Sequence, residues 1–135
     1  ESQSMLMNGD ASMVLVWSTR AKLLEKDSGG DISFIWDQGL IAPGSMAVIK
    51  GNPGGAEAAM KFIASAQDPA RQLVMFNMLA QGPANPATDA LLPPEDARYN
   101  PVDPANAAKQ IALNMEWYET NYGPALDAYL AIISA

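Results

Sequence analysis

The chain has 135 residues, with 8 Lys or Arg against 15 Asp or Glu, so its formal net charge is −7. It contains neither Cys nor His, which excludes disulfide scaffolds, thiol nucleophiles, histidine-based triads and ordinary zinc sites. The few cations are scattered singly along an acidic chain, and a protein that tracks phosphates needs a basic face. Nucleic-acid binding is therefore not expected.

The composition is typical of a folded protein, because 49% of the residues are hydrophobic. No apolar run approaches the ~18 residues that would span a bilayer. The first residue is Glu1, and the opening residues lack the basic and apolar regions of a signal peptide. We expect the sequence to be the interior of something longer.

The first fifty residues predict three strands and one helix. Short apolar or β-branched runs at 11–17, 31–36 and 45–50 are bounded by Gly, Asn and Pro, as buried strands are. Good helix formers fill 19–27, and Ser18 before them is expected to be the N-cap.

The hydrophobic period becomes helical after residue 55. Apolar residues recur every three or four positions over 56–67, which predicts an amphipathic helix with one buried face. Asp68–Pro69 is a typical helix start, and the helix it opens is expected to stop at Gly82–Pro83. Six prolines then predict an irregular connection over 82–104 that lies against a surface.

The last third is expected to be helical. Asp103–Pro104 predicts a helix start, and a continuous apolar stripe follows to Tyr122. Gly123–Pro124 is expected to break this helix before a final helix over 126–133. Most of the eight methionines fall at apolar positions of the predicted elements, where core filling is the expected role.

Strands feeding helices in this order indicate an α/β fold. Three short strands are few for about four helices, because both faces of a parallel sheet must be covered. The chain is therefore expected to form part of a larger sheet.

Two turns carry candidate binding residues. Trp17, Ser18 and Arg20 follow the first predicted strand at the start of a helix, and in open α/β sheets ligands collect at such carboxyl ends. Trp36 with Asp37–Gln38 repeats the arrangement after the second strand and offers an aromatic face, a carboxylate and an amide. The alternative for both is a structural strand end with a solvated turn.

Catalytic and cofactor sites find less support. The closest carboxylate pairs are Glu116 with Glu119 and Glu95 with Asp96, but neighbours on one helix or loop do not converge across a cleft as a hydrolase requires. The glycines of 51–55 lack the lysine and hydroxyl residue of a phosphate-binding loop. No metal site and no cofactor are expected.

The sequence also resembles a known family. NGDASMVLVWSTRA is similar to the G-x-a-x-m-x-x-x-W-x-x-R-A segment of periplasmic solute-binding proteins of ABC importers, in the branch that includes the spermidine/putrescine-binding proteins. FIWDQGL with SMAVIKGNPGGAEAAMKFIASAQDPARQ resembles that branch's W-N-Q-G-L and I-P-K-G-x-x-N-x-x-x-A-x-K-F-I motifs. QGPANPAT and KQIALNMEWYETN continue the resemblance towards the C-terminus.

The resemblance implies the C-terminal portion of a two-lobed periplasmic-binding-protein type II fold, with three-layer α/β/α lobes joined by hinge strands. Residues 1–43 and 91–135 would belong to the second lobe and 44–90 to the first. The ligand would lie in the cleft between lobes, near the Trp17 and Trp36 turns. The expected ligand-binding residues are Trp17, Ser18, Arg20, Trp36, Asp37, Gln38, Ser45 and Met46, the last two where the chain crosses the hinge.

Departures from the family pattern bear on the ligand. Gly44 and Met46 stand where polyamine binders carry an Asp and often a Trp, and Gln81 stands where the family often has Tyr. A buried ammonium without a counter-charge is costly, whereas Arg20 facing the cleft would favour a carboxylate or phosphonate. An amino acid-like or zwitterionic solute is therefore preferred, with a polyamine as the alternative.

The leading hypothesis is a non-enzymatic receptor of an ABC importer, exported to the periplasm, that captures a small polar solute and delivers it to a permease in the inner membrane. Its partners would be the solute, the permease and the N-terminal remainder of the same binding protein. Two alternatives stay open: a carboxylate-dependent hydrolase, and a helical interaction module that uses the stripe from Ala108 to Tyr122.

Overall fold

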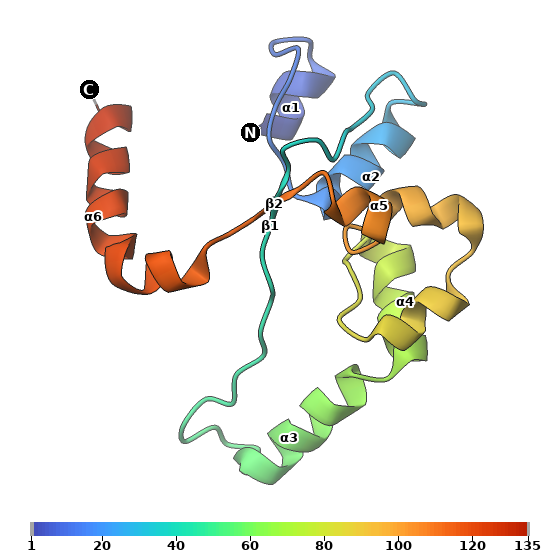
Figure 1. The fold of residues 1–135 in the computed structure, drawn as a ribbon, viewed down its shortest axis with the longest axis vertical. Helices are drawn as coiled ribbons and strands as arrows, with labels where there is room; N and C mark the ends of the chain where they lie inside the picture. Colours follow the sequence, from blue (N-terminus) through green and yellow to red (C-terminus); the bar gives the residue numbers. More distant parts are fainter. Residues whose placement is uncertain (1, 135) are drawn as a thin grey trace.

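The protein was analysed as a computed structural model that describes residues 2–134. Helices dominate these residues, and strands are confined to one short pair (Figure 1). The elements in chain order are α1 (Ser2–Met7), α2 (Ser18–Asp27), β1 (Leu40–Ile41), α3 (Gly55–Ala66), α4 (Pro69–Leu79), the 3₁₀ helices η1 (Pro86–Leu91) and η2 (Pro94–Tyr99), α5 (Pro104–Ala107), β2 (Ile111–Ala112) and α6 (Met115–Ile133).

The two strands join the first third of the chain to its last third. They run parallel, with Leu40 opposite Ile111 and Ile41 opposite Ala112. The backbone N–H of Ile111 donates to the carbonyl of Gly39 at 2.7 Å, and that of Leu113 donates to Ile41 at 2.9 Å. This pair is the point at which two long crossing segments are held side by side.

The three predicted strands at 11–17, 31–36 and 45–50 are not formed among the described residues. Segment 11–17 keeps a period of two in its exposure, since Met13, Leu15 and Trp17 are 84%, 76% and 83% exposed while the valines between them are half-buried. A strand exists only where a neighbouring strand shares its hydrogen bonds, and within residues 2–134 no strand pairs with these segments. The prediction of buried strands was therefore wrong among these residues, because 11–17 is unpaired and one of its faces is exposed.

The core lies where α4 packs against α2 and η1. Phe76 and Ala80 are 0% and 1% exposed, and Ala21 and Leu24 of α2 complete the apolar contact. The predicted start of α4 is confirmed, because the side chain of Asp68 accepts a hydrogen bond from the backbone N–H of Arg71 at 3.1 Å.

Side-chain amides hold the proline-rich connection against this core. The side-chain oxygen of Gln72 accepts from the N–H of Asn85 at 2.8 Å, and the Asn85 amide donates to the carbonyl of Gln67 at 2.8 Å. The Asn106 amide donates to the carbonyls of Ala97 and Asn100 at 2.9 and 2.8 Å. Prolines cannot donate from the backbone, so these amides supply the hydrogen bonds that the segment lacks. The prediction of an irregular stretch lying against a surface is confirmed, with two 3₁₀ helices inside it.

The predicted helix from 104 to 122 was wrong. Helix α5 ends at Ala107, because Ile111–Ala112 pairs with β1 and the Gln110 amide donates to the carbonyl of Pro101 at 2.7 Å. Helix α6 starts afresh after Asn114, whose side chain accepts from the N–H of Trp117 at 2.9 Å.

The predicted break at Gly123–Pro124 was also wrong, since α6 runs through Pro124. A proline removes one helical hydrogen bond and bends the helix without having to end it. Accordingly, α6 changes direction along its length (Figure 1).

Three smaller predictions also differ. The N-cap of α2 is Trp17 rather than Ser18, which is the first helical residue. The expected buried face of the 56–67 helix is missing, because no residue of α3 is buried. All eight methionines are exposed rather than core residues.

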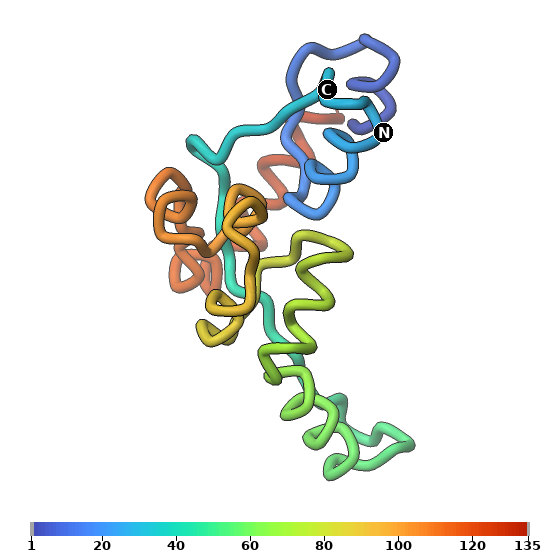
Figure 2. Tube along the Cα trace, turned by 90° about the vertical axis from the view of Figure 1, so that its right-hand side faces the viewer, coloured from blue at the N-terminus to red at the C-terminus, as the bar shows by residue number. Residues whose placement is uncertain are grey.

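The exposure of α3 follows from its position. The helix lies at the end of the molecule remote from α1 in both views, where little of the chain can cover it (Figure 1 and Figure 2).

The chain exposes much more surface than its mass requires. Its accessible surface is 9998 Å², whereas a compact monomer of this mass exposes about 6,800 Å² by the usual scaling. This excess of about 3,200 Å² lies on one chain, and it is more than the ~1,000–2,500 Å² that each partner usually contributes to a permanent interface. The exposed apolar segments and helices thus leave more surface open than a compact monomer of this mass does.

Candidate ligand-binding site

The turn Trp36–Gly39 is held by contacts with distant parts of the chain. The Trp36 indole Nε1 donates to the backbone carbonyl of Arg98 at 2.9 Å, and its ring meets Phe34 edge to face at 5.3 Å. The turn closes through the N–H of Gly39 and the carbonyl of Trp36 at 2.9 Å. Gln38 adopts a left-handed φ of 61°, which non-glycine residues rarely do. The turn is thus held in one conformation from both ends.

Lys109 completes this turn from the last third of the chain. The N–H of Gln38 donates to the Lys109 carbonyl at 2.8 Å, and the Lys109 Nζ lies 4.0 Å from Oδ2 of Asp37. Both side chains are more than half exposed, at 52% for Lys109 and 61% for Asp37, so the pair is loose and open to solvent. Sequence analysis missed Lys109, because nothing near it in the chain signals that residue 37 is its neighbour.

The second predicted group stands at the start of α2. Trp17 is 83% exposed, and its carbonyl accepts from the N–H groups of Arg20 and Ala21 at 2.8 and 3.0 Å. No side-chain hydrogen bond caps the start of this helix. Ser18 is half-buried and Arg20 is exposed. The structure therefore gathers an aromatic ring, a hydroxyl and a cation at this turn.

The remaining two predicted residues stand elsewhere. Ser45 and Met46 are exposed in the extended connection between β1 and α3, with Met46 at 56%. Among residues 2–134, no hydrogen bond or ion pair joins them to either tryptophan turn, or joins the two turns to each other. The structure therefore brings Trp36, Asp37 and Gln38 together, keeps Trp17, Ser18 and Arg20 as a second group, and leaves Ser45 and Met46 apart.

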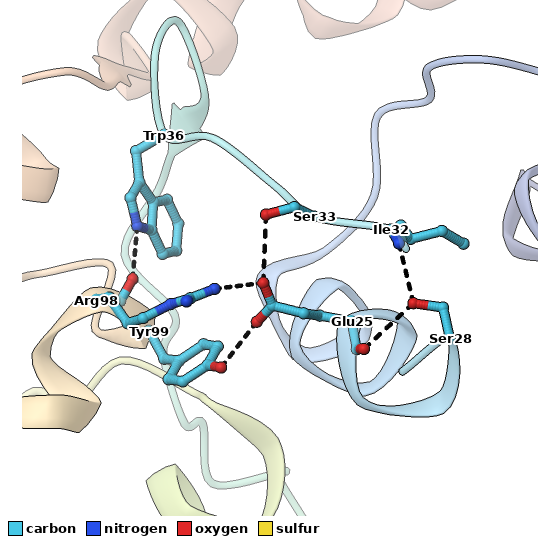
Figure 3. A network of polar contacts seen from close by, with 7 residues as sticks. All are labelled: Glu25, Ser28, Ile32, Ser33, Trp36, Arg98 and Tyr99. Carbon is cyan, nitrogen blue, oxygen red and sulfur yellow. Dashed lines mark hydrogen bonds and ion pairs between the residues drawn. The ribbon is translucent and has the colours of Figure 1, made fainter. Parts of the chain in front are cut away.

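A carboxylate behind the Trp36 turn organises its surroundings. Oε1 of Glu25 accepts from the Ser33 hydroxyl at 3.2 Å and from the Arg98 guanidinium, and Oε2 accepts from the Tyr99 hydroxyl at 2.7 Å (Figure 3). The segment that leads into the turn and the end of η2, more than seventy positions away, thus both bind the side chain of Glu25, which is 14% exposed.

The two ends of this network shift each other's pKa. Burial opposes ionisation of Glu25, but hydrogen bonds from Tyr99, Arg98 and Ser33 and the charge of Arg98 outweigh it, so its pKa lies below the ordinary 4.5. The hydrogen bond to Glu25, with burial, raises the pKa of Tyr99 above 10.0. At neutral pH the carboxylate is therefore ionised and the phenol is protonated.

The carboxylates considered for catalysis do not face one another across a cleft. Glu116 and Glu119 line an open hollow of about 590 Å³ along α6 with Tyr118 and Tyr122. Asp96 lines a separate hollow of about 580 Å³ beside α2. Within residues 2–134, no group of three acidic or other metal-binding side chains is placed to hold a metal ion. Over the same residues no helix has the length and apolarity needed to cross a membrane.

Solved structures share this fold. An ABC transporter substrate-binding protein from Bradyrhizobium japonicum USDA 110 superposes with a TM-score of 0.84 and 32% identity, over 96% of this chain and 40% of that one. The PBP AgtB from A. tumefaciens R10, solved in complex with agropinic acid, gives a TM-score of 0.80 and 31% identity over 99% of this chain and 42% of its own. The expected fold class, part of an α/β periplasmic-binding-protein fold, is confirmed.

Sequence comparison agrees. The γ-aminobutyric acid-binding protein of Pseudomonas aeruginosa is 34% identical over 113 residues, which are 84% of this chain and 32% of that protein. The chain thus spans about a third of the length of this curated relative. The sequence model of the bacterial extracellular solute-binding protein family matches residues 1–101, which include both tryptophan turns. The chain therefore belongs to the bacterial extracellular solute-binding protein family.

Proposed function

We propose that this chain is part of the solute-binding component of an ABC importer, which captures a small polar solute between two lobes and delivers it to a permease in the inner membrane. Family membership over residues 1–101 is the observation that carries the proposal. The proposed location is the periplasm, where such a receptor meets both solute and permease. Holding and releasing a solute requires no reaction, so we assign the protein no enzymatic activity.

The proposed ligand is an amino acid-like or zwitterionic solute rather than a polyamine. Asp37 and Lys109 present opposite charges 4.0 Å apart on an open surface beside Trp36, and a zwitterion can pair with both. Exposed Trp17 and Arg20 add an apolar face and a second cation for a carboxylate. A polyamine would find Asp37 but also two repelling cations. The relative named for γ-aminobutyric acid, whose ligand carries both charges, agrees with this preference.

The proposed lobes are residues 1–43 with 91–135 in one and residues 44–90 in the other. The exposed connection at 42–49 and the β1–β2 pair support a crossing there. In this division α2 and α4 belong to different lobes, so their contact, with Lys22 Nζ 5.2 Å from the Phe76 ring centre, is an interlobe contact. The proposed site then also includes Ser45 and Met46 beside the crossing.

A further portion of the same protein is the proposed partner for the exposed apolar surface. The relatives are between two and three times longer than this chain, and its excess surface of about 3,200 Å² is large enough for one side of an extensive permanent interface. The unpaired segments 11–17 and 31–36 need neighbouring strands, which only polypeptide can supply.

Ligand-dependent thermal shift of the full-length protein tests the proposal. We expect γ-aminobutyrate to raise the Tm more than putrescine does, because only the former pairs with both charges. Trp17→Ala and Asp37→Asn should each abolish most of the shift, while Trp117→Ala in α6 serves as the control and should leave it unchanged. Turnover of a solute, or the absence of any shift with amino acids and polyamines, would overturn the proposal.

A further inference from the structure

The Trp36 turn is attached to η2 through one residue, Arg98. Its backbone carbonyl accepts the indole N–H of Trp36 at 2.9 Å, while its guanidinium is bound by the carboxylate of Glu25 (Figure 3). Trp36 and Arg98 are 62 positions apart, and Glu25 and Arg98 are 73 apart. Arg98 therefore joins the indole of Trp36, through its backbone, to the carboxylate of Glu25, through its side chain.

Glu25 also holds the segment that leads into the turn. The hydroxyl of Ser33, three residues before Trp36, donates to the same carboxylate at 3.2 Å. Phe34 lies between the two ends of the network, with its ring 5.3 Å from Trp36 and 5.9 Å from Tyr99. The segment is thus fixed by one direct and one indirect connection to Glu25.

The other contacts of Arg98 reinforce this arrangement. Its guanidinium lies over the rings of Tyr99 at 4.6 Å and Phe34 at 5.9 Å, and the Tyr99 hydroxyl donates to Glu25 at 2.7 Å. An arginine beside two rings without an anion would be free to turn outward into solvent, since its side chain is 53% exposed. The charge of Glu25 selects the inward orientation.

We propose that Glu25 is a positioning residue for the solute site: it fixes Arg98 and Ser33, and through them sets the orientation of Trp36 and the Asp37–Gln38 turn without itself contacting solute. The inference rests on the proposed function for its consequence in binding, but the positioning can be measured separately. Glu25 lines the hollow that Lys22, Lys26 and Arg98 also line, whereas the carboxylate of Asp37 lies 4.0 Å from the Lys109 ammonium. The two carboxylates therefore lie in different sites.

The positioning is tested first on the full-length protein labelled with 5-fluorotryptophan, in which single Trp→Phe variants assign the fluorine NMR signals of Trp17, Trp36 and Trp117. Glu25→Gln removes the charge that holds Arg98, and we expect the Trp36 signal alone to move. Glu57→Gln is the matched control, because Glu57 forms an ion pair with Lys61 at 2.8 Å on α3 and is 84% exposed. An unmoved Trp36 signal in Glu25→Gln would overturn the proposal.

Should Glu25→Gln fail to fold, Ser33→Ala decides the question, since Ser33 is exposed and its removal deletes only one of the two connections. We expect a smaller displacement of the Trp36 signal in that variant. A signal identical to that of the unsubstituted chain would count against the proposal.

The binding consequence is measured in the full-length protein with γ-aminobutyrate by calorimetry. Glu25→Gln should weaken affinity roughly tenfold, as the loss of one charge-assisted hydrogen bond does, with Glu57→Gln unchanged. A moved Trp36 signal with unaltered affinity, or weaker affinity with an unmoved signal, would each overturn the positioning role. If the unsubstituted protein binds neither γ-aminobutyrate nor putrescine, the proposed function fails while the fluorine signal still reports on Glu25.

Discussion

Helix α4 and helix α6 are both rich in apolar residues, but α4 is packed against other elements and α6 is exposed. The 11 residues of α4 pack on α2 and η1 and bury Phe76 completely. The 19 residues of α6 bury no side chain, and Tyr122 and Ile132 are 60% and 76% exposed. The apolar pattern of a helix therefore predicts which face would be buried, but that face is buried only where a neighbouring element packs against it.

The largest expected difference between the two helices comes from deleting an apolar side chain in each. Phe76→Ala should lower the free energy of unfolding by about 3–5 kcal/mol, because it leaves a cavity in the core. In the 135-residue chain taken alone, Ile132→Ala in α6 should change it by less than about 0.5 kcal/mol, since that side chain is solvated there. Urea denaturation followed by circular dichroism measures both changes, and equal losses would contradict the comparison.

Glycine-to-alanine substitutions should have opposite signs in the two regions. A Cβ at Gly82 would lie 2.6 Å from Cγ of Pro101, so Gly82→Ala should destabilise the core region by about 1–3 kcal/mol. A Cβ at Gly123 in α6 meets no atom within 4 Å, so Gly123→Ala should stabilise by roughly 0.5–1 kcal/mol through helix propensity. Thermal unfolding of the two variants compares them, and a stabilising Gly82→Ala would show that the close approach to Pro101 is not maintained.

Amide side chains offer a sharper version of the same test. Asn106→Ala removes the side-chain donor from the carbonyls of Ala97 and Asn100, which keep one backbone N–H partner each, and should cost about 1–2 kcal/mol. Asn121→Ala in α6 removes a 2.8 Å bond to the carbonyl of Trp117, which water can replace, so the cost should stay below about 0.5 kcal/mol. Chemical denaturation of the pair measures the difference. A larger loss for Asn121→Ala would indicate that α6 is covered in solution.

The smallest expected effect is a pH dependence at the edge of the core region. Because the folded pKa of Glu25 lies below 4.5, its contribution to stability is present above pH 4.5 and is lost as pH falls through the lower folded pKa. The raised pKa of Tyr99 gives a contribution present below pH 10.0 that is lost as pH rises through the folded value. The free energy of unfolding, measured by denaturation at a series of pH values, should therefore fall more steeply below pH 4.5 in the unsubstituted chain than in Glu25→Gln. An identical pH dependence of the two proteins would show that the Glu25 carboxylate does not bind Arg98 and Tyr99 in solution.

Much of the helical structure was predictable because its signals are local. Asp68 and Pro69 define the start of α4 within four residues, and helix formers ended by Gly29–Gly30 define α2. The binding turns were found for the same reason, since Trp36, Asp37 and Gln38 are adjacent in the chain. The partners of that turn were not found, because Lys109 and Arg98 reach it from the other side of the fold.

The helices with local start and stop signals, the two tryptophan turns and the family could all be predicted from the sequence. The contacts of Glu25 with Arg98 and Tyr99, the pairing of Ile111–Ala112 with β1 and the unpaired state of the predicted strands became visible only in the folded chain. The difference lies in the range of the interactions. A helix satisfies its hydrogen bonds within four residues, whereas a strand or an ion-pair network needs groups that are distant in sequence and are chosen by the fold.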